Sequence, residues 1–430
     1  MRKRLLLLLI IIILATAVRA LPAKREVLVL TYNGIINPVA SEFITKAIDK
    51  ASNEKAEAIV IELDTPGGLD TSMRDIVKKI IGSDTPVVVY VAPSGARAAS
   101  AGVFITLSAN IAAMAPGTNI GAAHPVSLEG KMDKTMAEKV VNDASAYIRS
   151  IAQKRGRNQQ WAEDAVRKSI SSSAQEALKE DVIDIISPDL NSLLKSIDGR
   201  TVVTPIGPKT IRTADAKLVR LNLGLRGRIL NTISDPNVAY ILMLLGFYGL
   251  FFELTSPGAI LPGVVGTICL ILAFYSFQTL PVNYAGLLLI ILAIVLFILD
   301  VKAATHGVLT IGGIVSMIIG SLMLFESPAP YMRVSLIIIL PVVILTAVFF
   351  TVIVTLVIKA HRKKPSTGKE GLIGLEGIAR TDIATEEGRV FVHGELWRAW
   401  SDEPIKAGDK IVVIGLDGLK LKVKKKEGMK

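Results

Sequence analysis

The chain has 430 residues, more than one compact domain usually holds, so two or three domains are expected. Hydrophobic residues make up 51% and charged residues 20%, a composition that excludes a disordered chain and is too apolar for an ordinary soluble enzyme. The formal net charge is +11, and the single cysteine, Cys269, excludes a disulfide framework, a cysteine-rich zinc site and a CxxC redox motif.

Residues 1–20 have the organisation of a secretion signal. A basic start, Met1–Arg4, precedes the apolar run Leu5–Ala15, and the segment ends at Ala20 with small residues at the positions that a signal peptidase reads. The apolar run is shorter than the about 20 residues that a membrane span needs. We therefore expect a cleaved signal peptide or an uncleaved N-terminal anchor, and either one places the next segment outside the cytoplasm.

Residues 21–198 alternate short β-branched runs with stretches of helical periodicity. The expected strands are Val27–Tyr32, Ala58–Leu63, Pro86–Val91 and Ile111–Met114, and the expected helices between them include Ser41–Asn53 and Thr71–Ile81. This alternation predicts an α/β domain built around a largely buried parallel sheet. A longer helix is expected at about Met132–Lys154, with one apolar stripe formed by Met136, Val140, Ala144, Tyr147, Ile148 and Ile151.

The composition changes abruptly after a loosely patterned segment, residues 199–235, which we interpret as a linker. Residues 236–358 contain only five charged side chains, Glu253, Asp300, Lys302, Glu326 and Arg333. The apolar runs in this region are Val238–Leu254, Ile260–Phe277, Ala285–Leu299, Val308–Phe325 and Val334–Ile358. Each is close to the length of a tilted spanning helix, so five transmembrane helices are expected. Gly312, Gly313 and Gly320 are interpreted as sites of close helix packing.

A basic cluster, Lys359–Lys364, follows the last apolar run and is the strongest signal for a cytoplasmic end. An exported N-terminal domain followed by five spans also places the C-terminus in the cytoplasm. Arg226 and Arg228, before the first span, favour the opposite orientation, but long exported domains override local charge. The expected location is therefore the cell membrane, with multiple spans.

Residues 366–430 form a separate, soluble domain in this interpretation. Short β-like runs are separated by Gly or Glu-Gly turns, at Leu372–Ala379, Arg389–Val392, Glu395–Trp400, Lys410–Ile414 and Leu419–Val423. Five short strands in so small a segment predict an all-β, OB-like barrel. Its basic residues are offset by glutamates and only Trp397 and Trp400 offer stacking faces, so a protein partner is expected and nucleic acid is not.

Two turns of the α/β domain have the residues that an acyl-transfer site needs. The run DTPGG, residues 64–68, follows an expected strand, and its paired glycines can present bare N–H groups to an oxyanion. The run GARAASAG, residues 95–102, holds Ser100 among small residues at an expected helix start, where developing negative charge is favoured. Each motif alone is also consistent with a structural role: the first as a tight turn, the second as a capped helix.

Two residues are candidate general bases for Ser100. Lys139 lies on the long expected helix, at the edge of its apolar stripe, and a lysine can activate a serine when burial keeps it neutral. His124 follows Ser100 by 24 residues, and histidine acts as a base near neutral pH without a large perturbation. A solvated lysine and a structural histidine are the alternatives. The other histidines do not converge on a metal site, and no cofactor-binding motif is found.

The pair DTPGG and GARAASAG, followed by EALKEDVID at residues 176–184, resembles the ClpP/crotonase-like serine proteases. The order of signal, protease domain, apolar spans and small barrel resembles the long-form NfeD family, the partner proteases of stomatin operons. This resemblance implies that Ser100 is the nucleophile and Lys139 the base of a serine–lysine dyad. It also implies oxyanion donors at the backbone N–H groups of Gly68 or Leu69, and of Ala101.

The resemblance implies a membrane-bound serine endopeptidase that cleaves hydrophobic segments of stomatin- or prohibitin-like membrane proteins, and that is a homo-oligomer without a cofactor or metal. In soluble ClpP proteases the triad histidine occupies a position similar to that of His124. A non-catalytic scaffold that organises stomatin-like proteins in the membrane is the alternative from another functional class. A crotonase-type acyl-CoA enzyme is disfavoured because an exported domain does not meet acyl-CoA.

Overall fold

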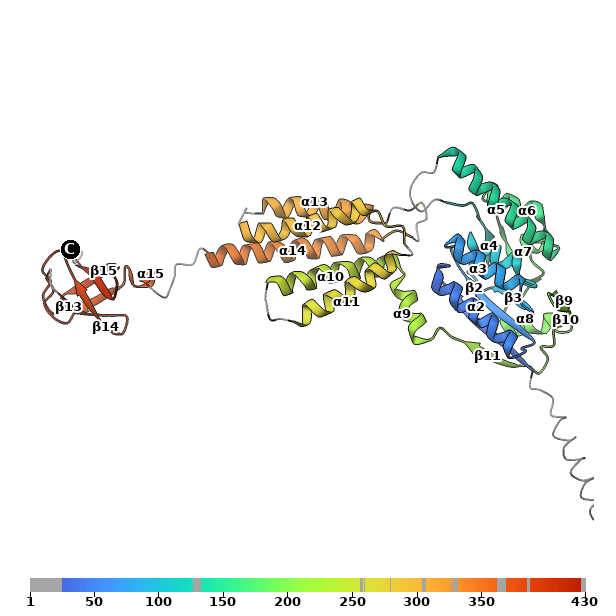
Figure 1. The fold of residues 1–430 in the computed structure, drawn as a ribbon, viewed down its shortest axis with the longest axis horizontal. Coiled ribbons are helices and arrows are strands. Elements are labelled where there is room, and N and C mark those ends of the chain that lie inside the picture. The colour runs from blue at the N-terminus through green and yellow to red at the C-terminus, as the bar shows by residue number, and fades with distance from the viewer. Residues whose placement is uncertain are drawn as a thin grey trace, which may run out of the picture. The chain divides into compact units, whose positions relative to one another are not determined.

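The computed structural model describes residues 25–126, 133–255, 258, 260–278, 280–303, 307–325, 327, 332–361, 369–384 and 387–426. The expected signal segment, residues 1–20, lies outside the described residues. The chain divides into two units, one holding the α/β domain and the other holding the barrel, with the division running through the apolar helices. The predicted fold class, an α/β domain followed by apolar helices and a small all-β barrel, is confirmed (Figure 1).

The α/β domain is built on a six-stranded sheet with the order β11-β1-β2-β3-β5-β8. Its strands are β1 (Glu26–Asn33), β2 (Ala58–Asp64), β3 (Val87–Val91), β5 (Ile111–Met114), β8 (Ile185–Ile186) and β11 (Lys217–Leu221). All neighbouring pairs in it are parallel. The central strands are nearly continuous runs of buried residues because both faces of the sheet are covered. Each strand expected from the sequence is present.

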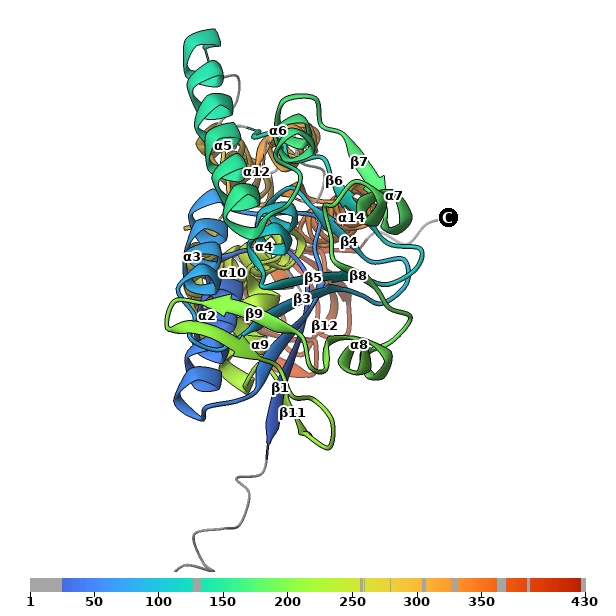
Figure 2. The same ribbon diagram turned by 90° about the vertical axis from the view of Figure 1, so that its right-hand side faces the viewer.

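Helices cover the two faces of this sheet unequally. The larger core contains the inner sides of α2 (Pro38–Asn53), α3 (Asp70–Ile81), α4 (Ala101–Ser108), α5 (Lys134–Arg155), α6 (Gln159–Arg167) and α7 (Ala174–Lys179). The smaller core, on the other face, is closed by α8 (Leu190–Ile197). Figure 2 shows α5 reaching well beyond the other helices of the domain. Its buried residues all lie from Ala144 onward, so the expected apolar stripe is only partly covered, and Met136 is 48% exposed.

A second, three-stranded sheet lies beside the main one, in the order β4-β6-β7. It consists of β4 (Arg97–Ala99), β6 (Asn119–Gly121) and β7 (Ser171–Ser173). Strand β4 pairs in parallel with β6, so its carboxyl end meets the carboxyl end of β6 at Gly121. Because β4 ends at Ala99, this small sheet holds the backbone immediately before Ser100.

Residues 199–235, which the sequence suggested to be a linker, are ordered. Strands β9 (Thr201–Thr204) and β10 (Gly207–Thr210) form a hairpin, β11 pairs with β1, and α9 (Leu225–Ile233) precedes the apolar helices. The α/β domain therefore continues to Leu221. The sequence did not reveal β11 because this edge strand is largely exposed and its polar residues do not form a β-like pattern.

The apolar region folds into α10 (Pro236–Thr255), α11 (Leu261–Phe277), α12 (Tyr284–Ala303), α13 (Val308–Met323) and α14 (Leu336–His361). Each expected apolar run is a helix. The segment Pro236–Leu254 is long and apolar enough to cross a membrane, and the other apolar segments within the described residues are shorter. Close packing at Gly320 is confirmed, since a Cβ atom there would lie 2.8 Å from the carbonyl oxygen of Gly286.

The C-terminal domain is a closed barrel with the strand order β12-β13-β14-β16-β15. After the short helix α15 (Lys369–Leu372) come β12 (Glu376–Ala379), β13 (Gly388–Val392), β14 (Glu395–Trp400), β15 (Lys410–Asp417) and β16 (Lys420–Lys425). Its small core alternates along the strands, with Val390, Val392, Ile411 and Val413 buried. The predicted small barrel is therefore confirmed, although its first strand starts only at Glu376 because α15 and a turn precede it.

Candidate active site

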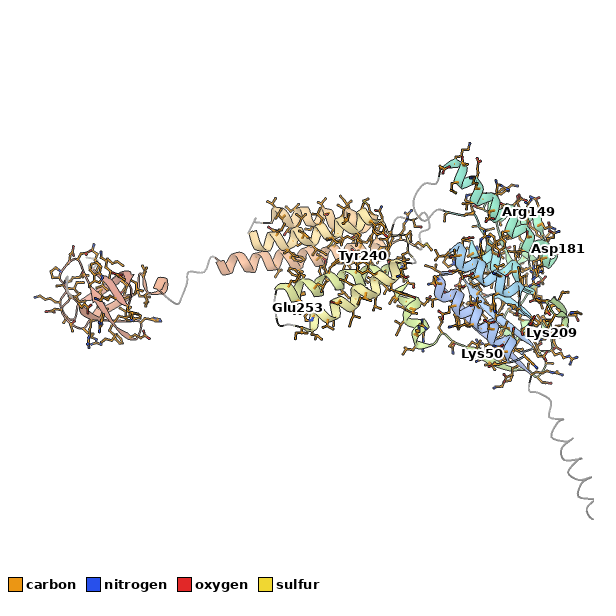
Figure 3. The ribbon with its side chains drawn as sticks, in the orientation of Figure 1. Lys50, Arg149, Asp181, Lys209, Tyr240 and Glu253 are labelled. Atoms are coloured by element: carbon orange, nitrogen blue, oxygen red, sulfur yellow. The ribbon has the colours of Figure 1, made fainter. Side chains whose placement is uncertain are left out.

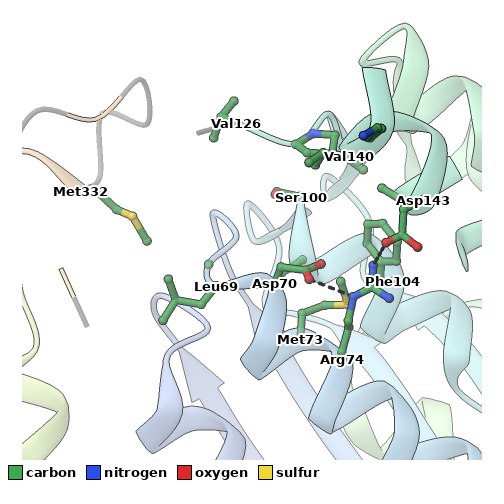
Figure 4. Close-up of a pocket in the computed structure, with 16 residues that line it drawn as sticks. Leu69, Asp70, Met73, Arg74, Ser100, Phe104, Val126, Val140, Asp143 and Met332 are labelled. Carbon is green, nitrogen blue, oxygen red and sulfur yellow. Dashed lines mark hydrogen bonds and ion pairs between the residues drawn. The ribbon is translucent and has the colours of Figure 1, made fainter. Parts of the chain in front are cut away.

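Apart from His124, the site residues that the sequence singled out meet at one cavity of about 440 Å³ on the α/β domain (Figure 4). One wall is the start of α3 with Gly68 and Leu69 before it, and the opposite wall is the first half of α5 with Lys139. Between them lies the start of α4, with Ser100 and Ala101. Apolar side chains, including those of Met73, Phe104, Val126 and Val140, complete the lining.

Ser100 has an uncommon backbone conformation. It is the N-cap residue of α4, with φ of 52° and ψ of −111°, and its side chain makes no capping hydrogen bond. Its N–H donates to the carbonyl oxygen of Gly121 at 3.1 Å, and its carbonyl oxygen accepts from the N–H of Val103 at 3.0 Å. These bonds hold a strained turn in which the hydroxyl is not used by the helix and lines the cavity.

The glycine turn packs directly on the backbone of Ile36. The N–H of Ile36 donates to the carbonyl oxygen of Gly67, and the N–H of Leu69 donates to the carbonyl oxygen of Ile36, both at 2.8 Å. A Cβ atom at Gly68 would lie 2.1 Å from that carbonyl oxygen, so only glycine fits. Because Gly68 lies between two residues that bond to Ile36, its own N–H is directed to the other side of the chain.

Two backbone N–H groups at the cavity are available to a ligand. For Gly68 and Ala101, no hydrogen bond donated by the backbone is found within the part of the chain that the structure describes. Ala101 is the first residue of α4, where an N–H has no partner within the helix. The N–H of Leu69, the other candidate donor from the sequence, is already bonded to Ile36. The geometry therefore favours Gly68 over Leu69.

The two candidate bases occupy different environments. Lys139 lines the cavity and is exposed, because the first turns of α5 extend beyond the core. His124 does not line the cavity, although Ala123 and Pro125 do. Its Nδ1 lies 2.8 Å from the carbonyl oxygen of Val166, which fixes a ring N–H at that position and leaves Nε2 as the possible acceptor. The position of His124 outside the cavity lining favours a structural role.

Charged residues that the sequence did not single out line the same cavity. Arg74 on α3 donates from Nε to Asp70 at 2.8 Å and from Nη2 to Asp143 on α5 (Figure 4). The spacing of Asp70 and Arg74 is that of an ordinary helix ion pair and could have been read from the sequence. The bond to Asp143 joins residues 69 positions apart, and no sequence signal reveals it.

The contacts of Arg74 shift its own pKa and that of Tyr147. Desolvation lowers the pKa of Arg74, but the hydrogen bonds and charges of Asp70 and Asp143 outweigh that effect and raise the pKa overall. Burial raises the pKa of the Tyr147 phenol, and the positive charge of Arg74 opposes that rise. Arg74 is therefore a permanent cation on the cavity wall.

No group of three metal-ligating side chains is found among the residues described.

Family models match the chain in three consecutive parts. They are described as the N-terminal domain of NfeD1b at residues 26–190, the NfeD integral membrane domain at 237–356, and the NfeD-like C-terminal, partner-binding domain at 369–425. The second and third matches coincide with the apolar helices and the barrel, and the first covers the α/β domain up to the start of α8. The apolar helices are thereby identified as a membrane domain.

Two relatives match over nearly their whole length. The chain is 39% identical to the membrane-bound protease PH1510 of Pyrococcus horikoshii, covering 100% of this chain and 99% of the relative. It is 27% identical to the membrane protein NfeD1b of Bacillus subtilis, covering 98% of each. A relative described as a membrane-bound protease is therefore aligned with every domain of this chain.

Solved structures similar to the chain include the 1510-N membrane protease from Pyrococcus horikoshii, described as specific for a stomatin homologue. It is 37% identical and covers 50% of this chain and 100% of its own, with a TM-score of 0.44. A lysine-to-alanine mutant of a 1510-N stomatin-specific protease in complex with a substrate peptide is also 37% identical. It covers 49% of this chain and 98% of its own, with a TM-score of 0.46.

Proposed function

This chain belongs to the long-form NfeD family of membrane proteins, and from that premise we propose that it is a membrane-bound serine endopeptidase with a Ser100–Lys139 dyad. The observation that carries the proposal is the convergence on one cavity of a serine in a strained turn, a lysine, and two backbone N–H groups that have no acceptor among the described residues. The full-length identity to a membrane-bound protease supports the same reaction.

In the first half of the proposed reaction, Oγ of Ser100 attacks the carbonyl carbon of the scissile peptide and its proton passes to Nζ of Lys139. The carbonyl oxygen becomes an oxyanion, which accepts hydrogen bonds from the N–H groups of Gly68 and Ala101. One such donor is worth about 10²–10³ in kcat, because it acts where the charge develops. Lys139 then returns the proton to the departing amine, and an acyl-enzyme remains.

In the second half, Lys139 takes a proton from a water molecule, which attacks the acyl carbon. The same N–H groups stabilise the second oxyanion, and its collapse breaks the ester bond and returns the proton to Oγ of Ser100. This step regenerates the free serine and releases the carboxylate product, without any redox change or cofactor. His124 has no part in this scheme, since it does not line the cavity.

The lining of the cavity is suited to an apolar substrate. Its exposed lining surface is mainly apolar, with Met73, Phe104, Val126 and Val140 among the residues that contribute. Lys139 is exposed on the free chain, yet a lysine accepts a proton only when its neutral form is favoured by desolvation. An apolar segment bound across the cavity would cover Lys139 and exclude water from the reacting groups. The description of the Pyrococcus relative as specific for a stomatin homologue fits a substrate with hydrophobic segments.

The test is active-site labelling of the full chain in detergent with a fluorophosphonate probe, alongside cleavage of an apolar peptide. The wild type is expected to be labelled and active, and Ser100→Ala neither. Ser94→Ala is the matched control, because Ser94 is an exposed serine of the same loop that does not line the cavity. Failure of the wild type to react with the probe and the peptide would favour the scaffold function, for which the partner-binding description of the barrel's family is the supporting observation.

A further inference from the structure

A cluster of charged and aromatic side chains joins the three helices that border the cavity. We propose that Arg74 is a positioning residue for the dyad: it holds the half of α5 that carries Lys139 at its distance from Ser100. The inference rests on the proposed function. It concerns a residue that touches neither the scissile bond nor the oxyanion in the proposed reaction.

The first link joins α3 to α5. The guanidinium of Arg74 is shared between Asp70 on its own helix, at 2.8 Å, and Asp143 on α5. Asp143 lies one turn after Lys139, and α3 begins directly after the glycine turn that contains Gly68. The same guanidinium is therefore connected to the element that provides an oxyanion donor and to the element that provides the base.

The second link joins this pair to α4. The guanidinium carbon of Arg74 lies 4.4 Å from the centroid of the Tyr147 ring, on α5. The Tyr147 ring stacks on Phe104 with centroids 6.0 Å apart and an interplanar angle of 25°. Phe104 lies one turn after Ser100 on α4. The stack Arg74–Tyr147–Phe104 thus sets α5 against the helix that presents the nucleophile.

The position of Asp143 on α5 explains why this link matters. The buried residues of α5 all follow Asp143, beginning with Ala144. Lys139 belongs to the preceding part, which extends beyond the core, so the ion pair acts where the helix leaves the core. A shift of about 1 Å in a catalytic group can cost about 10²-fold in rate, so the orientation of these turns is expected to control kcat.

The same contacts contribute little to folding, which makes the proposal testable. The side chains of Arg74, Asp70 and Asp143 are 34%, 63% and 67% exposed. Ion pairs at such exposure usually contribute little to stability because water and salt screen them. Loss of Arg74 is therefore expected to reduce the rate without a matching loss of stability, whereas a merely structural residue would affect both.

The experiment compares Arg74→Ala, Asp143→Ala and Arg149→Ala in the full chain in detergent, with an apolar peptide as substrate. Arg149 is the matched control: it also lies on α5 and bonds across to another helix, with Glu163 of α6 at 3.1 Å, but it does not line the cavity (Figure 3). For Arg74→Ala and Asp143→Ala, kcat is expected to fall about 10–100-fold. KM is expected to stay within about twofold of the wild type and the thermal midpoint close to it. Arg149→Ala is expected to leave kcat unchanged.

Two further variants sharpen the result. The double variant Arg74→Ala/Asp143→Ala is expected to be no slower than Arg74→Ala, since Asp143 acts through its bond to Arg74. Arg74→Lys is expected to recover little activity, because an ammonium cannot bridge two carboxylates and stack on a ring as a guanidinium does. An active wild type whose Arg74→Ala variant keeps its kcat would overturn the inference and leave the dyad intact. Equal losses of kcat and thermal midpoint in Arg74→Ala and Arg149→Ala would overturn it too, and an inactive wild type would overturn both proposals.

Discussion

The strained backbone of Ser100 keeps two proposed catalytic groups available at the cavity. A non-glycine residue with φ of 52° and ψ of −111° costs about 1–3 kcal/mol, and the neighbouring hydrogen bonds to Gly121 and Val103 compensate for it. A relaxed N-cap serine would turn its hydroxyl onto the helix N–H groups. The strained turn instead leaves both the hydroxyl of Ser100 and the N–H of Ala101 available at the cavity.

The identity of the general base is decided by comparing two variants under one assay. Lys139→Ala is expected to lower kcat nearly as much as Ser100→Ala, and Lys139→Arg is expected to fail as well, because a guanidinium cannot accept the serine proton. His124→Ala is expected to keep most of the activity, since His124 does not line the cavity. Peptide cleavage by each purified variant is the measurement. An inactive His124→Ala with an active Lys139→Ala would reverse the assignment.

The oxyanion donor is tested at Gly68. A methyl group at this position would meet the carbonyl oxygen of Ile36 at 2.1 Å, so Gly68→Ala must displace the turn and its N–H. We expect kcat to fall by at least about 10² and stability to fall by about 1–3 kcal/mol. Gly82→Ala is the control, since a Cβ atom there would come no closer than 3.3 Å to its neighbours. Steady-state kinetics and thermal unfolding measure both effects, and an unimpaired Gly68→Ala would exclude this donor.

At the scale of elements, the edge of the main sheet depends on a loop held by one carboxylate. Oδ1 of Asp198 accepts from the N–H groups of Thr213 at 2.6 Å and Ala214 at 2.9 Å, just before β11. The hydrogen bonds from Ala214 and Thr213 lower the pKa of Asp198. The carboxylate therefore contributes to the position of the edge strand that the sequence did not reveal.

The lowered pKa predicts a pH dependence of stability. A carboxyl group whose pKa is lower in the folded chain stabilises the fold above its unfolded pKa of about 3.9. That contribution is lost as pH falls through the folded value. Asp198→Asn is therefore expected to lower the thermal midpoint at pH 7, and by much less at a pH below the folded pKa of Asp198.

The measurement is thermal unfolding in detergent at neutral and acidic pH. Asp75→Asn is the control, because Asp75 is exposed and has no side-chain hydrogen bond within the described part of α3. If Asp198→Asn lowers the thermal midpoint by the same amount at both pH values, the carboxylate charge is not the source of the stabilisation. The loop would then depend on the geometry of the acceptor alone.

At the scale of the whole molecule, the proposed topology places residues 33–198 outside the cytoplasm and residues 371–426 inside it. It is supported by the signal-like start, the apolar helices within the family's membrane domain, and the basic cluster Lys359–Lys364. Reporter fusions at Arg200 and Lys363 are expected to report opposite sides of the membrane. Reporters on the same side would mean that an apolar helix does not cross, with the short run Ala285–Leu299 the first candidate.

Much of this protein follows from local sequence signals. Periodicity and turn residues act within a few positions, so they predicted the α/β alternation, the apolar helices and the small barrel, which the structure confirms. The motifs around Gly68 and Ser100 were also readable, because acyl transfer needs small residues and bare N–H groups at such turns. The assignment of Ser100 and Lys139 as a dyad stays a prediction.

The tertiary structure decided what depends on contacts between distant segments. The bond from Leu69 to Ile36 leaves Gly68 as the available donor, Val166 engages His124, and β11 completes the sheet from residues that have no β pattern. The link from Arg74 to Asp143 spans two helices that are unrelated in sequence. The type and spacing of a side chain limit the interactions that it can make. Its actual partners are determined by tertiary packing, which brings together segments that no local pattern connects.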